Sequence, residues 1–353
     1  MLPIQITNIN QHYKNNRIVK KQLLLLSLSI ILSANISGQE KMTVAFYNVE
    51  NLFDTVDNPA TNDDEFTPEG DRRWNSSKYW NKLEHISQTL VAIDQENSPE
   101  IIGLCEIENE TVIKDLTERS PLRHIGYSFV VTESKDARGI DVALIFKKSY
   151  FRLIKSEELE VNIRPINGKT TRNILHVTGR VATGDTIDIY VCHWPSRLGG
   201  VNESAPLRAE AAKVLNSSVN QVTESRRKPY IIVMGDMNDG CESASIRDIL
   251  RAKSSDRAYY LKDDELVTLL DNCPDGSYRY NGEWDTYDQL IVSGSFTNEL
   301  GCLSAKNARI CNFDFLLEDD TKYGGKKPFR NFNGYRYQNG YSDHLPIAFD
   351  IEY

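Results

Sequence analysis

The sequence has no surplus of basic residues. It contains 41 lysines and arginines against 50 aspartates and glutamates among 353 residues, a formal net charge of −9 at pH 7. The first 38 residues hold four of the basic residues and no acidic one, so the remainder is more acidic still. Proteins that bind nucleic acid through its phosphates are usually basic. The composition therefore weakens the case for a nucleic-acid partner without excluding it, because a bound divalent cation can supply positive charge locally.

Histidine and cysteine are scarce, with six of each. Zinc cages are built from these residues, and no cysteine belongs to the candidate site residues described below, so a zinc cage is not expected. Cys105 and Cys192 lie in apolar strand patterns and are expected to be buried thiols. If the chain is exported, disulfides are permitted, and the pair that we expect is Cys302 with Cys311, although spacing alone does not fix connectivity.

No apolar run in the sequence is long enough to cross a bilayer. The longest is Leu23 to Leu32, which follows Lys20 and Lys21 and precedes small residues that end at Gly38. A basic flank, a short apolar run and small residues are typical of a secretion signal. We therefore expect residues 1–38 to be a signal peptide and the protein to be periplasmic or secreted without a stable membrane anchor. The alternative is a buried first strand or helix.

No repeat or low-complexity linker divides the chain, so residues 39–353 are expected to form a single domain. Apolar periodicity predicts helices over residues 76–94, capped by Ser76 or Ser77, over 109–118, over 244–253, and from Ser204 onward with Pro206 in the first turn. A hairpin turn is expected at Asn167-Gly168 and loops over 294–341. Buried strands between these helices indicate a layered α/β fold.

The stretch from Pro229 to Gly240 shows where chemistry is expected. Five apolar residues run into Gly235 and then into Asp236, Asn238 and Asp239. An apolar run bounded in this way is typical of a strand covered on both faces. Buried carboxylates are costly unless a cation or substrate satisfies them, so a site is favoured over a turn that merely ends the strand.

Other apolar runs also begin or end with polar side chains. Val44 to Asn51 carries Asn48 and Glu50 at its end, and Asp343 and His344 precede the run Leu345 to Phe349. Between them, runs are followed by Glu106 and by His193, and one is preceded by Asp288. Ligands in layered α/β folds bind at such strand ends.

The ordered set Asn48, Glu106, His193, Asp236-x-Asn238, Asp288 and Asp343-His344 resembles the endonuclease/exonuclease/phosphatase superfamily over residues 43–353. This superfamily includes pancreatic-type deoxyribonucleases, apurinic-site endonucleases, bacterial sphingomyelinases and inositol-polyphosphate phosphatases. The resemblance implies two packed mixed β-sheets flanked by helices, a four-layer α/β/β/α sandwich with the site at one edge. It also implies hydrolysis of phosphoesters with Mg²⁺, for which Mn²⁺ is a substitute.

The resemblance assigns a role to most of the candidate residues. The metal ligands would be Asn48, Glu50, Glu106 and Asp343. The catalytic residues would be His193, Asp236, Asn238, Asp288 and His344, with Asp288 orienting His344 and Asp236 activating water. Asp141 would support His193. The residues themselves suggest the phosphate contacts: Ser196 and Arg197 follow His193 directly, and Arg208 and Arg138 are either further contacts or ordinary surface arginines. Each role has a purely structural alternative. Glu106 would then be a surface carboxylate, Asp343 would cap a turn, and His344 would be a strand histidine whose hydrogen bonds are satisfied within the protein.

The substrate is expected to be DNA or RNA, cleaved by in-line attack of water. Alternatives are a phosphoesterase of the same fold acting on inositol phosphates or sphingomyelin-type headgroups, and a binding module without catalysis. Glu108 stands where deoxyribonucleases tend to carry a basic DNA contact, which argues against close approach of a phosphate backbone. No protein partner is indicated, and a monomer is expected.

Overall fold

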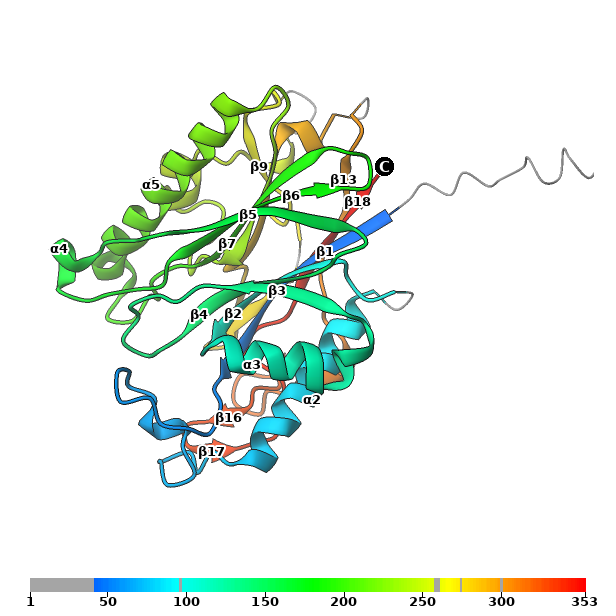
Figure 1. Ribbon diagram of the computed structural model, residues 1–353. Coiled ribbons are helices and arrows are strands. Elements are labelled where there is room, and N and C mark those ends of the chain that lie inside the picture. The colour runs from blue at the N-terminus through cyan, green and yellow to red at the C-terminus, as the bar shows by residue number, and fades with distance from the viewer. Residues whose placement is uncertain (1–40, 95–96, 257–260, 274, 299–300) are drawn as a thin grey trace, which may run out of the picture. The chain divides into compact units, whose positions relative to one another are not determined.

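Two six-stranded mixed sheets packed face to face form the centre of the fold (Figure 1). The computed structural model describes residues 41–94, 97–256, 261–273, 275–298 and 301–353, and the predicted signal peptide lies outside them. The first sheet has the order β13 (Ser304–Ile310), β18 (Ile347–Glu352), β1 (Lys41–Leu52), β2 (Ile101–Ile107), β4 (Asp141–Lys147), β3 (Tyr127–Val131). The second has the order β5 (Phe151–Leu159), β6 (Ile174–Val181), β7 (Thr186–His193), β8 (Tyr230–Asp236), β12 (Asp288–Ser293), β9 (Leu266–Thr268).

The two sheets share one pairing pattern. In each, among the described strands, a single parallel pair lies at the centre, β1 with β2 and β7 with β8, and all other pairs are antiparallel. Each parallel pair is joined by a long helix, α2 (Ser76–Ile93) or α5 (Val201–Ser225). Parallel strands need such a crossover. The chain thereby brings the ends of four strands to one edge of the fold.

Three apolar layers hold the sandwich together. The middle layer lies between the sheets and includes Val44, Phe46, Val177 and Ile232. A second layer packs α2 and α3 (Glu110–Lys114) on the outer face of the first sheet, and a third packs α5 on the outer face of the second sheet. Figure 1 shows these helices on opposite sides of the two sheets. The predicted four-layer sandwich is confirmed.

Sequence periodicity located the helices but missed some caps. Asn75, and not Ser76 or Ser77, caps α2 by accepting a hydrogen bond from the Lys78 N–H. Helix α5 begins three residues before Ser204, whose hydroxyl instead donates to the carbonyl of Gly200 within the first turn. Over residues 244–253 the regular part is a π-type turn, Ser245–Leu250.

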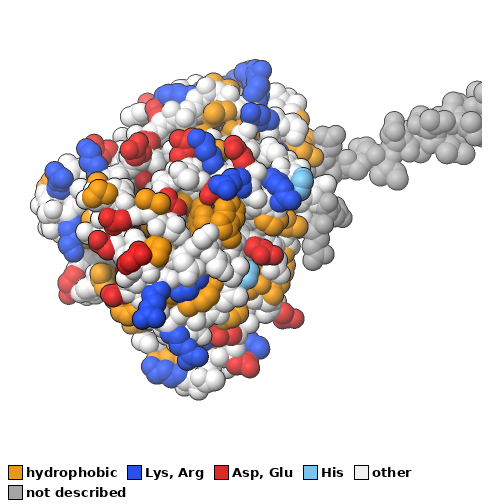
Figure 2. All heavy atoms as spheres, turned by 60° about the horizontal axis from the view of Figure 1, so that its bottom comes forward, with side chains coloured by type: hydrophobic (Ala, Val, Ile, Leu, Met, Phe, Trp, Pro, Cys, Tyr) orange, Lys and Arg blue, Asp and Glu red, His pale blue; other side chains and the backbone are white. Residues whose placement is uncertain are grey.

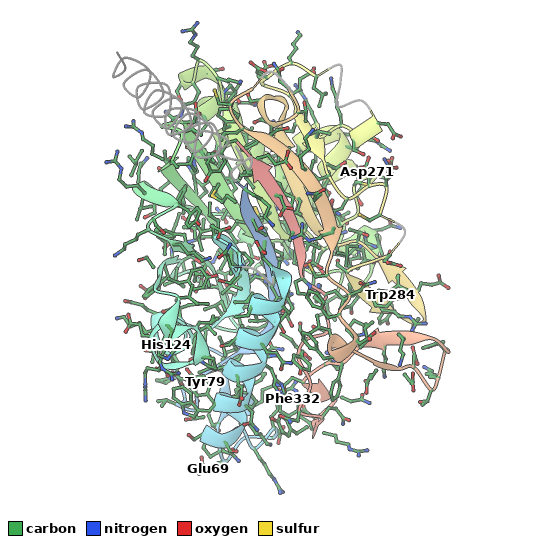
Figure 3. All side chains as sticks on the ribbon, turned by 90° about the vertical axis from the view of Figure 1, so that its right-hand side faces the viewer. Glu69, Tyr79, His124, Asp271, Trp284 and Phe332 are labelled. Carbon is green, nitrogen blue, oxygen red and sulfur yellow. The ribbon has the colours of Figure 1, made fainter. Side chains whose placement is uncertain are left out.

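Two predicted loops were wrong in detail. Asn167 and Gly168 do not form a two-residue hairpin turn, because they end the short helix α4 (Arg164–Asn167), with Gly168 in the left-handed conformation at φ 74°. The region 294–341 contains the edge strand β13 and the short pairs β14 (Leu317–Asp319) with β15 (Lys326–Pro328) and β16 (Phe332–Asn333) with β17 (Arg336–Tyr337). A further two-stranded ribbon, β10 (Tyr278–Tyr280) and β11 (Glu283–Asp285), precedes β12. Figure 3 shows Trp284 on this ribbon.

All six cysteines are free thiols, so the predicted Cys302–Cys311 disulfide is not formed. Cys105 and Cys192 are buried, as expected from their strand patterns. Gly235 of β8 is required for close packing, because a Cβ there would lie 2.3 Å from the carbonyl oxygen of Cys192 on the neighbouring strand. Among the described residues, no helix is long and apolar enough to cross a membrane.

Glu108 is not an exposed acid. Its side chain follows β2, is 9 % exposed and accepts a 2.6 Å hydrogen bond from the backbone N–H of Asp54. Burial raises the pKa of Glu108 to about 8, with the nearby charges of Asp54 and Asp63 acting in the same direction. The expectation that Glu108 repels a phosphate backbone is therefore wrong, because the carboxyl is buried and largely protonated at neutral pH.

We predict that Glu108 makes the protein less stable as pH rises. The unfolded carboxyl ionises near its ordinary pKa while the folded carboxyl stays protonated to about pH 8, so the loss develops between these two values and amounts to about 2–4 kcal/mol. Glu108→Gln should remove this difference in denaturant unfolding at pH 5 and pH 8.5, whereas the exposed Glu69→Gln should not. An unchanged pH dependence in Glu108→Gln would contradict the assignment.

Candidate active site

Six predicted residues meet at one edge of the two sheets. Asn48 and Glu106 lie near the ends of the parallel strands β1 and β2, and His193 and Asp236 end the parallel strands β7 and β8. The antiparallel strands beside them begin at the same edge. Asp288 is the first residue of β12, and His344 lies just before β18. The register pairs Asp236 with both His193 and Asp288. The pairing pattern of the sheets thus gathers residues that are far apart in sequence.

The backbone at this edge is irregular. Glu50, Asn51, Glu106 and Asn238 have positive φ angles of 51°, 58°, 62° and 50°. The ladders shift register at the same places, between Asn48 and Leu52 on β1 and after Cys105 on β2. Left-handed backbone is unfavourable for glutamate, by about 1–2 kcal/mol, and such strain together with strand bulges is often found at functional sites. The irregularity turns the side chains of Glu50 and Glu106 out of the strand alternation.

Asp288 and His344 form a buried pair. His344 Nδ1 lies 2.7 Å from Asp288 Oδ2, which also accepts a 2.6 Å hydrogen bond from the hydroxyl of Ser277. Burial opposes the charged imidazole, but the carboxylates of Asp288 and Asp236 outweigh it and hold the pKa of His344 well above its usual range. His344 is therefore an imidazolium at neutral pH, oriented by Asp288.

Asp236 lies at the centre of the site and contacts several of its residues. Its Oδ2 accepts a 3.1 Å hydrogen bond from Asn48 Nδ2 and lies 3.7 Å from the Nε2 atoms of both His193 and His344. Its Oδ1 accepts the backbone N–H of Asn238 at 2.9 Å. Burial raises the pKa of Asp236 to about 7, against the attraction of His344. A carboxyl with this pKa can accept a proton from water near neutral pH.

His193 faces Asp236 and Glu106 but lacks a carboxylate partner at its other nitrogen. Nε2 lies 3.7 Å from Asp236 Oδ2 and 4.0 Å from Glu106 Oε1, and the buried Nδ1 makes no hydrogen bond to the described residues. Burial, together with the charges of Arg172 and Arg138, holds the pKa of His193 well below its usual range. His193 is therefore neutral where His344 is charged.

Asp141 does not support His193. Its carboxylate accepts hydrogen bonds from the hydroxyl of Thr132 at 2.6 Å and from the backbone N–H of Ser134, and it fixes the turn between β3 and β4. Position alone could not show this, because both residues lie at strand ends. The residue that holds the His193 segment is Arg172, which donates to the carbonyls of His193 and Trp194 and pairs with Asp136.

Glu106 is the carboxylate best placed to bind a metal ion. Oε2 accepts the N–H of Asn51 at 2.9 Å and lies 3.6 Å from Arg138 Nη2. Oε1 lies 4.0 Å from His193 Nε2 and has no hydrogen bond to the described residues. Asn48 Oδ1 accepts the N–H of Glu50 and keeps a second lone pair. Carboxylate and amide oxygens suit Mg²⁺. Glu106 and Asn48 therefore fit a hard divalent cation.

Asp236, Asp288 and His344 offer a second grouping, with ligand atoms within 4.8 Å of one another. A cation could in principle be held there. However, the 2.7 Å contact already joins His344 Nδ1 to Asp288 Oδ2, and a charged imidazole does not ligate a metal. We therefore interpret these three residues as an acid–base cluster.

Glu50 and Asp343, which are expected from the sequence to bind the metal, both pair with an arginine. Arg330 lies between them, with Nη2 3.1 Å from Glu50 Oε1 and 3.0 Å from Asp343 Oδ2. The other oxygen of Glu50 accepts the backbone N–H of Asn331 at 2.8 Å. The buried Lys82 adds a second positive charge, which acts on the pKa of Glu50 against the effect of burial.

The predicted phosphate contacts divide into two groups. Arg208 is 1 % exposed and pairs with Asp239 at 2.8 Å, so it cannot reach a substrate and its predicted role is wrong. Arg197 also pairs with Asp239 and donates to the carbonyl of Asn238 at 2.7 Å, but its side chain remains 27 % exposed beside the site. Arg138 borders Glu106, and the exposed Ser196 lies one residue before Arg197.

Three site residues were missed from the sequence: Lys82, Arg330 and Tyr278. Lys82 could have been found from the helical periodicity of α2. It lies three residues after Tyr79, which Figure 3 labels, and four before Ile86, so it belongs to the buried face of the helix. Arg330 and Tyr278 lie in segments that are joined to the site only by folding. The ring of Tyr278 is 4.8 Å from that of His344.

The chain matches the endonuclease/exonuclease/phosphatase family over residues 43–353. It belongs to this family. Members are phosphoester hydrolases that depend on divalent metal ions. The match covers every residue of the site described above. No curated protein sequence matches the chain significantly.

Solved structures of the family share the fold at low sequence identity. A family member from Bacteroides thetaiotaomicron is 14 % identical with a TM-score of 0.55, and the match covers 89 % of this chain and 95 % of that one. TDP2 from D. rerio in complex with a single-strand DNA product is 14 % identical with a TM-score of 0.53, over 89 % and 99 %. A mannosyl-6-phosphatase from B. thetaiotaomicron is 14 % identical with a TM-score of 0.54, over 88 % and 100 %. Identity at this level establishes the fold alone.

We predict that Asp288→Asn lowers kcat by about 10²–10⁴-fold, because the amide no longer stabilises the imidazolium of His344. The pKa of His344, followed by NMR titration of its ring protons, should fall in the same variant. Ser277→Ala is the matched control: it removes a hydrogen bond to Asp288 but leaves the charge, and should have a much smaller effect on both quantities. An unshifted His344 titration in Asp288→Asn would exclude the pair as the cause.

Proposed function

We propose that this protein is an exported phosphodiesterase that hydrolyses nucleic acid by in-line attack of water with the help of Mg²⁺. The observation that supports hydrolysis best is the arrangement around Asp236, a proton acceptor whose Oδ2 atom lies within 4 Å of both a charged and a neutral histidine. Phosphoester hydrolysis needs a base for water and fixed positive charge for the phosphoryl oxygens.

Each residue has a part that follows from its contacts. Asp236 positions the attacking water and accepts its proton, and the His344 imidazolium, held by Asp288, binds a phosphoryl oxygen. Asn238 donates one amide hydrogen to the carbonyl of Trp194 and keeps the other for the phosphoryl group. His193, being neutral, can donate to an oxygen through Nε2. A cation held by Glu106 and Asn48 would neutralise phosphoryl charge.

Aromatic rings beside His344 favour a nucleic-acid substrate. Tyr278 on β10 lies against His344, and its ring centroid is 5.6 Å from that of Tyr287, over which Arg197 places its guanidinium at 4.4 Å. Tyr280, two residues along the same strand and hence on the same face, is 63 % exposed. Nucleobases stack on exposed aromatic side chains near basic groups. These rings therefore support a substrate in which a base stacks on the ribbon next to the scissile phosphate.

A phosphoesterase acting on a small molecule is the second candidate. Figure 2 shows acidic and basic side chains interspersed on the face that it presents, without a broad basic expanse for a long polyanion. The fold serves both classes, since its relatives include TDP2 with a DNA product and a mannosyl-6-phosphatase. Export is proposed from the sequence of residues 1–38 alone.

We predict chelator-sensitive hydrolysis of plasmid DNA or RNA by the full chain, and little turnover of inositol phosphates or sphingomyelin. Glu106→Gln should lower kcat by at least about 100-fold, because the lost ligand removes several kcal/mol of transition-state stabilisation. Glu69→Gln, at an exposed glutamate, is the control. Turnover of a small phosphoester without cleavage of nucleic acid would move the assignment to the second candidate.

We also predict that Tyr280→Ala raises KM for a single-stranded oligonucleotide by roughly 5- to 100-fold, the range expected for loss of one stacked base. Hydrolysis of a small methyl aryl phosphodiester should change little. Tyr335→Ala is a matched control, because Tyr335 is 62 % exposed but lies in the turn between β16 and β17, where its ring contacts Arg72. Equal effects of the two variants would exclude a stacking role for Tyr280.

A further inference from the structure

Arg330 is fixed in place from both sides. The preceding residue, Phe329, accepts the backbone N–H of Tyr341 at 2.6 Å, and the following residue, Asn331, donates its backbone N–H to Glu50. The guanidinium reaches Glu50 Oε1 through Nε at 3.2 Å and Nη2 at 3.1 Å, and Asp343 Oδ2 through Nη2 at 3.0 Å. Few rotamers satisfy all of these contacts, so its position is set by the fold.

Glu50 and Asp343 are thereby neutralised by the protein itself. Glu50 is buried, and a buried carboxylate without compensation would be costly. Arg330 supplies one positive charge, and the buried Lys82, which donates to the carbonyl of Tyr341, supplies a second. A divalent cation placed between Glu50 and Asp343 would have to displace the guanidinium or lie against it. Glu106, whose Oε1 has no such partner among the described residues, remains as the carboxylate open to a metal ion.

The guanidinium also has a side that is not used by these carboxylates. Its side chain is 45 % exposed, and Nη1 takes part in none of the contacts above. Asp343 is close enough to His344 to favour its charged form, and Arg330 is close enough to Tyr278, whose ring lies 4.8 Å from that of His344, to act on its hydroxyl. The guanidinium therefore lies beside the acid–base cluster. A guanidinium binds phosphate oxygens well because it is planar and permanently charged.

We propose that Arg330 takes the place of a second metal ion: it neutralises Glu50 and Asp343 and offers its free edge to a phosphoryl oxygen, so that the protein binds one divalent cation, at Glu106. The second part, contact with substrate, rests on the proposed function. The first part concerns metal stoichiometry and does not depend on turnover. Glu106 and Arg330 then act as separate centres for the same phosphate.

The stoichiometry is tested by titrating the full chain with Mn²⁺ and measuring free Mn²⁺ by EPR. Wild-type protein should bind one ion, and Glu106→Gln should lose it. Arg330→Ala should gain a second, weaker site, because Glu50 and Asp343 are then uncompensated, while Arg330→Lys should still bind one. Two ions on the wild type, or one on Arg330→Ala, would overturn the proposal. The wild-type arm requires no variant to fold.

The substrate contact is tested with inorganic phosphate as competitor and a phosphodiester as substrate. Arg330→Ala should weaken inhibition by phosphate about 10- to 100-fold, as expected for a lost charged hydrogen bond. Arg336→Ala, at an exposed arginine of the adjacent β17, should leave it unchanged. If phosphate inhibits Arg330→Ala as strongly as the wild type, the proposed contact between Arg330 and phosphate is wrong. If no phosphoester is hydrolysed at all, the proposed function fails, while the Mn²⁺ count still decides the role of Arg330.

Discussion

Compensation of buried negative charge is the constraint on which this edge of the fold depends. Five carboxylates gather there: Glu50, Glu106, Asp236, Asp288 and Asp343. Burial raises the pKa of Asp236 and of Glu50 to about 7, which shows how little solvent is left to screen them. Two sets of positive charges compensate four of them. The imidazolium of His344 stabilises Asp288 and Asp236, and Arg330 with Lys82 stabilises Glu50 and Asp343. Among the described residues, the nearest positive charge to Glu106 is Arg138, 3.6 Å away, and Lys82 acts on it from farther off. This weaker compensation is what makes Glu106 suited to a metal ion.

The two histidines show how neighbouring charges divide the chemistry. Both are buried, and burial lowers the pKa of each. His344 faces Asp288 and Asp236, whose charges reverse the effect, whereas His193 faces Arg172 and Arg138, which add to it. One ring is thus charged and the other neutral at the same pH, within reach of the same carboxylate. A site with two such rings can stabilise phosphoryl charge and provide a neutral donor without exchanging protons with solvent first.

The strand ends were predictable from sequence, and the loop partners were not. Asn48, Glu106, Asp236 and His344 each lie at one end of an apolar run, which is visible in the sequence. The pairing of the central strands then brings these side chains together. The partner of Glu50 is 280 residues away, in Arg330, and no spacing indicates that contact. The positive φ angles at Glu50 and Glu106 come from bulges that tertiary pairing imposes. Glu108 was misjudged for the same reason, because its burial depends on the loop around Asp54.

The acidic composition says little about the charge that a phosphate meets at this site. Interactions between exposed charges fade over about 8 Å at physiological ionic strength, so most of the 50 acidic residues are screened from the cleavage point. What remains are the groups at the edge itself, where Arg138, Arg197 and Arg330 are partly exposed, the buried His344 is charged and most carboxylates are already paired. Glu108, the acid that argued against a polyanion, is largely protonated at neutral pH. A polyanionic substrate is therefore compatible with an acidic protein, provided that it approaches along this edge.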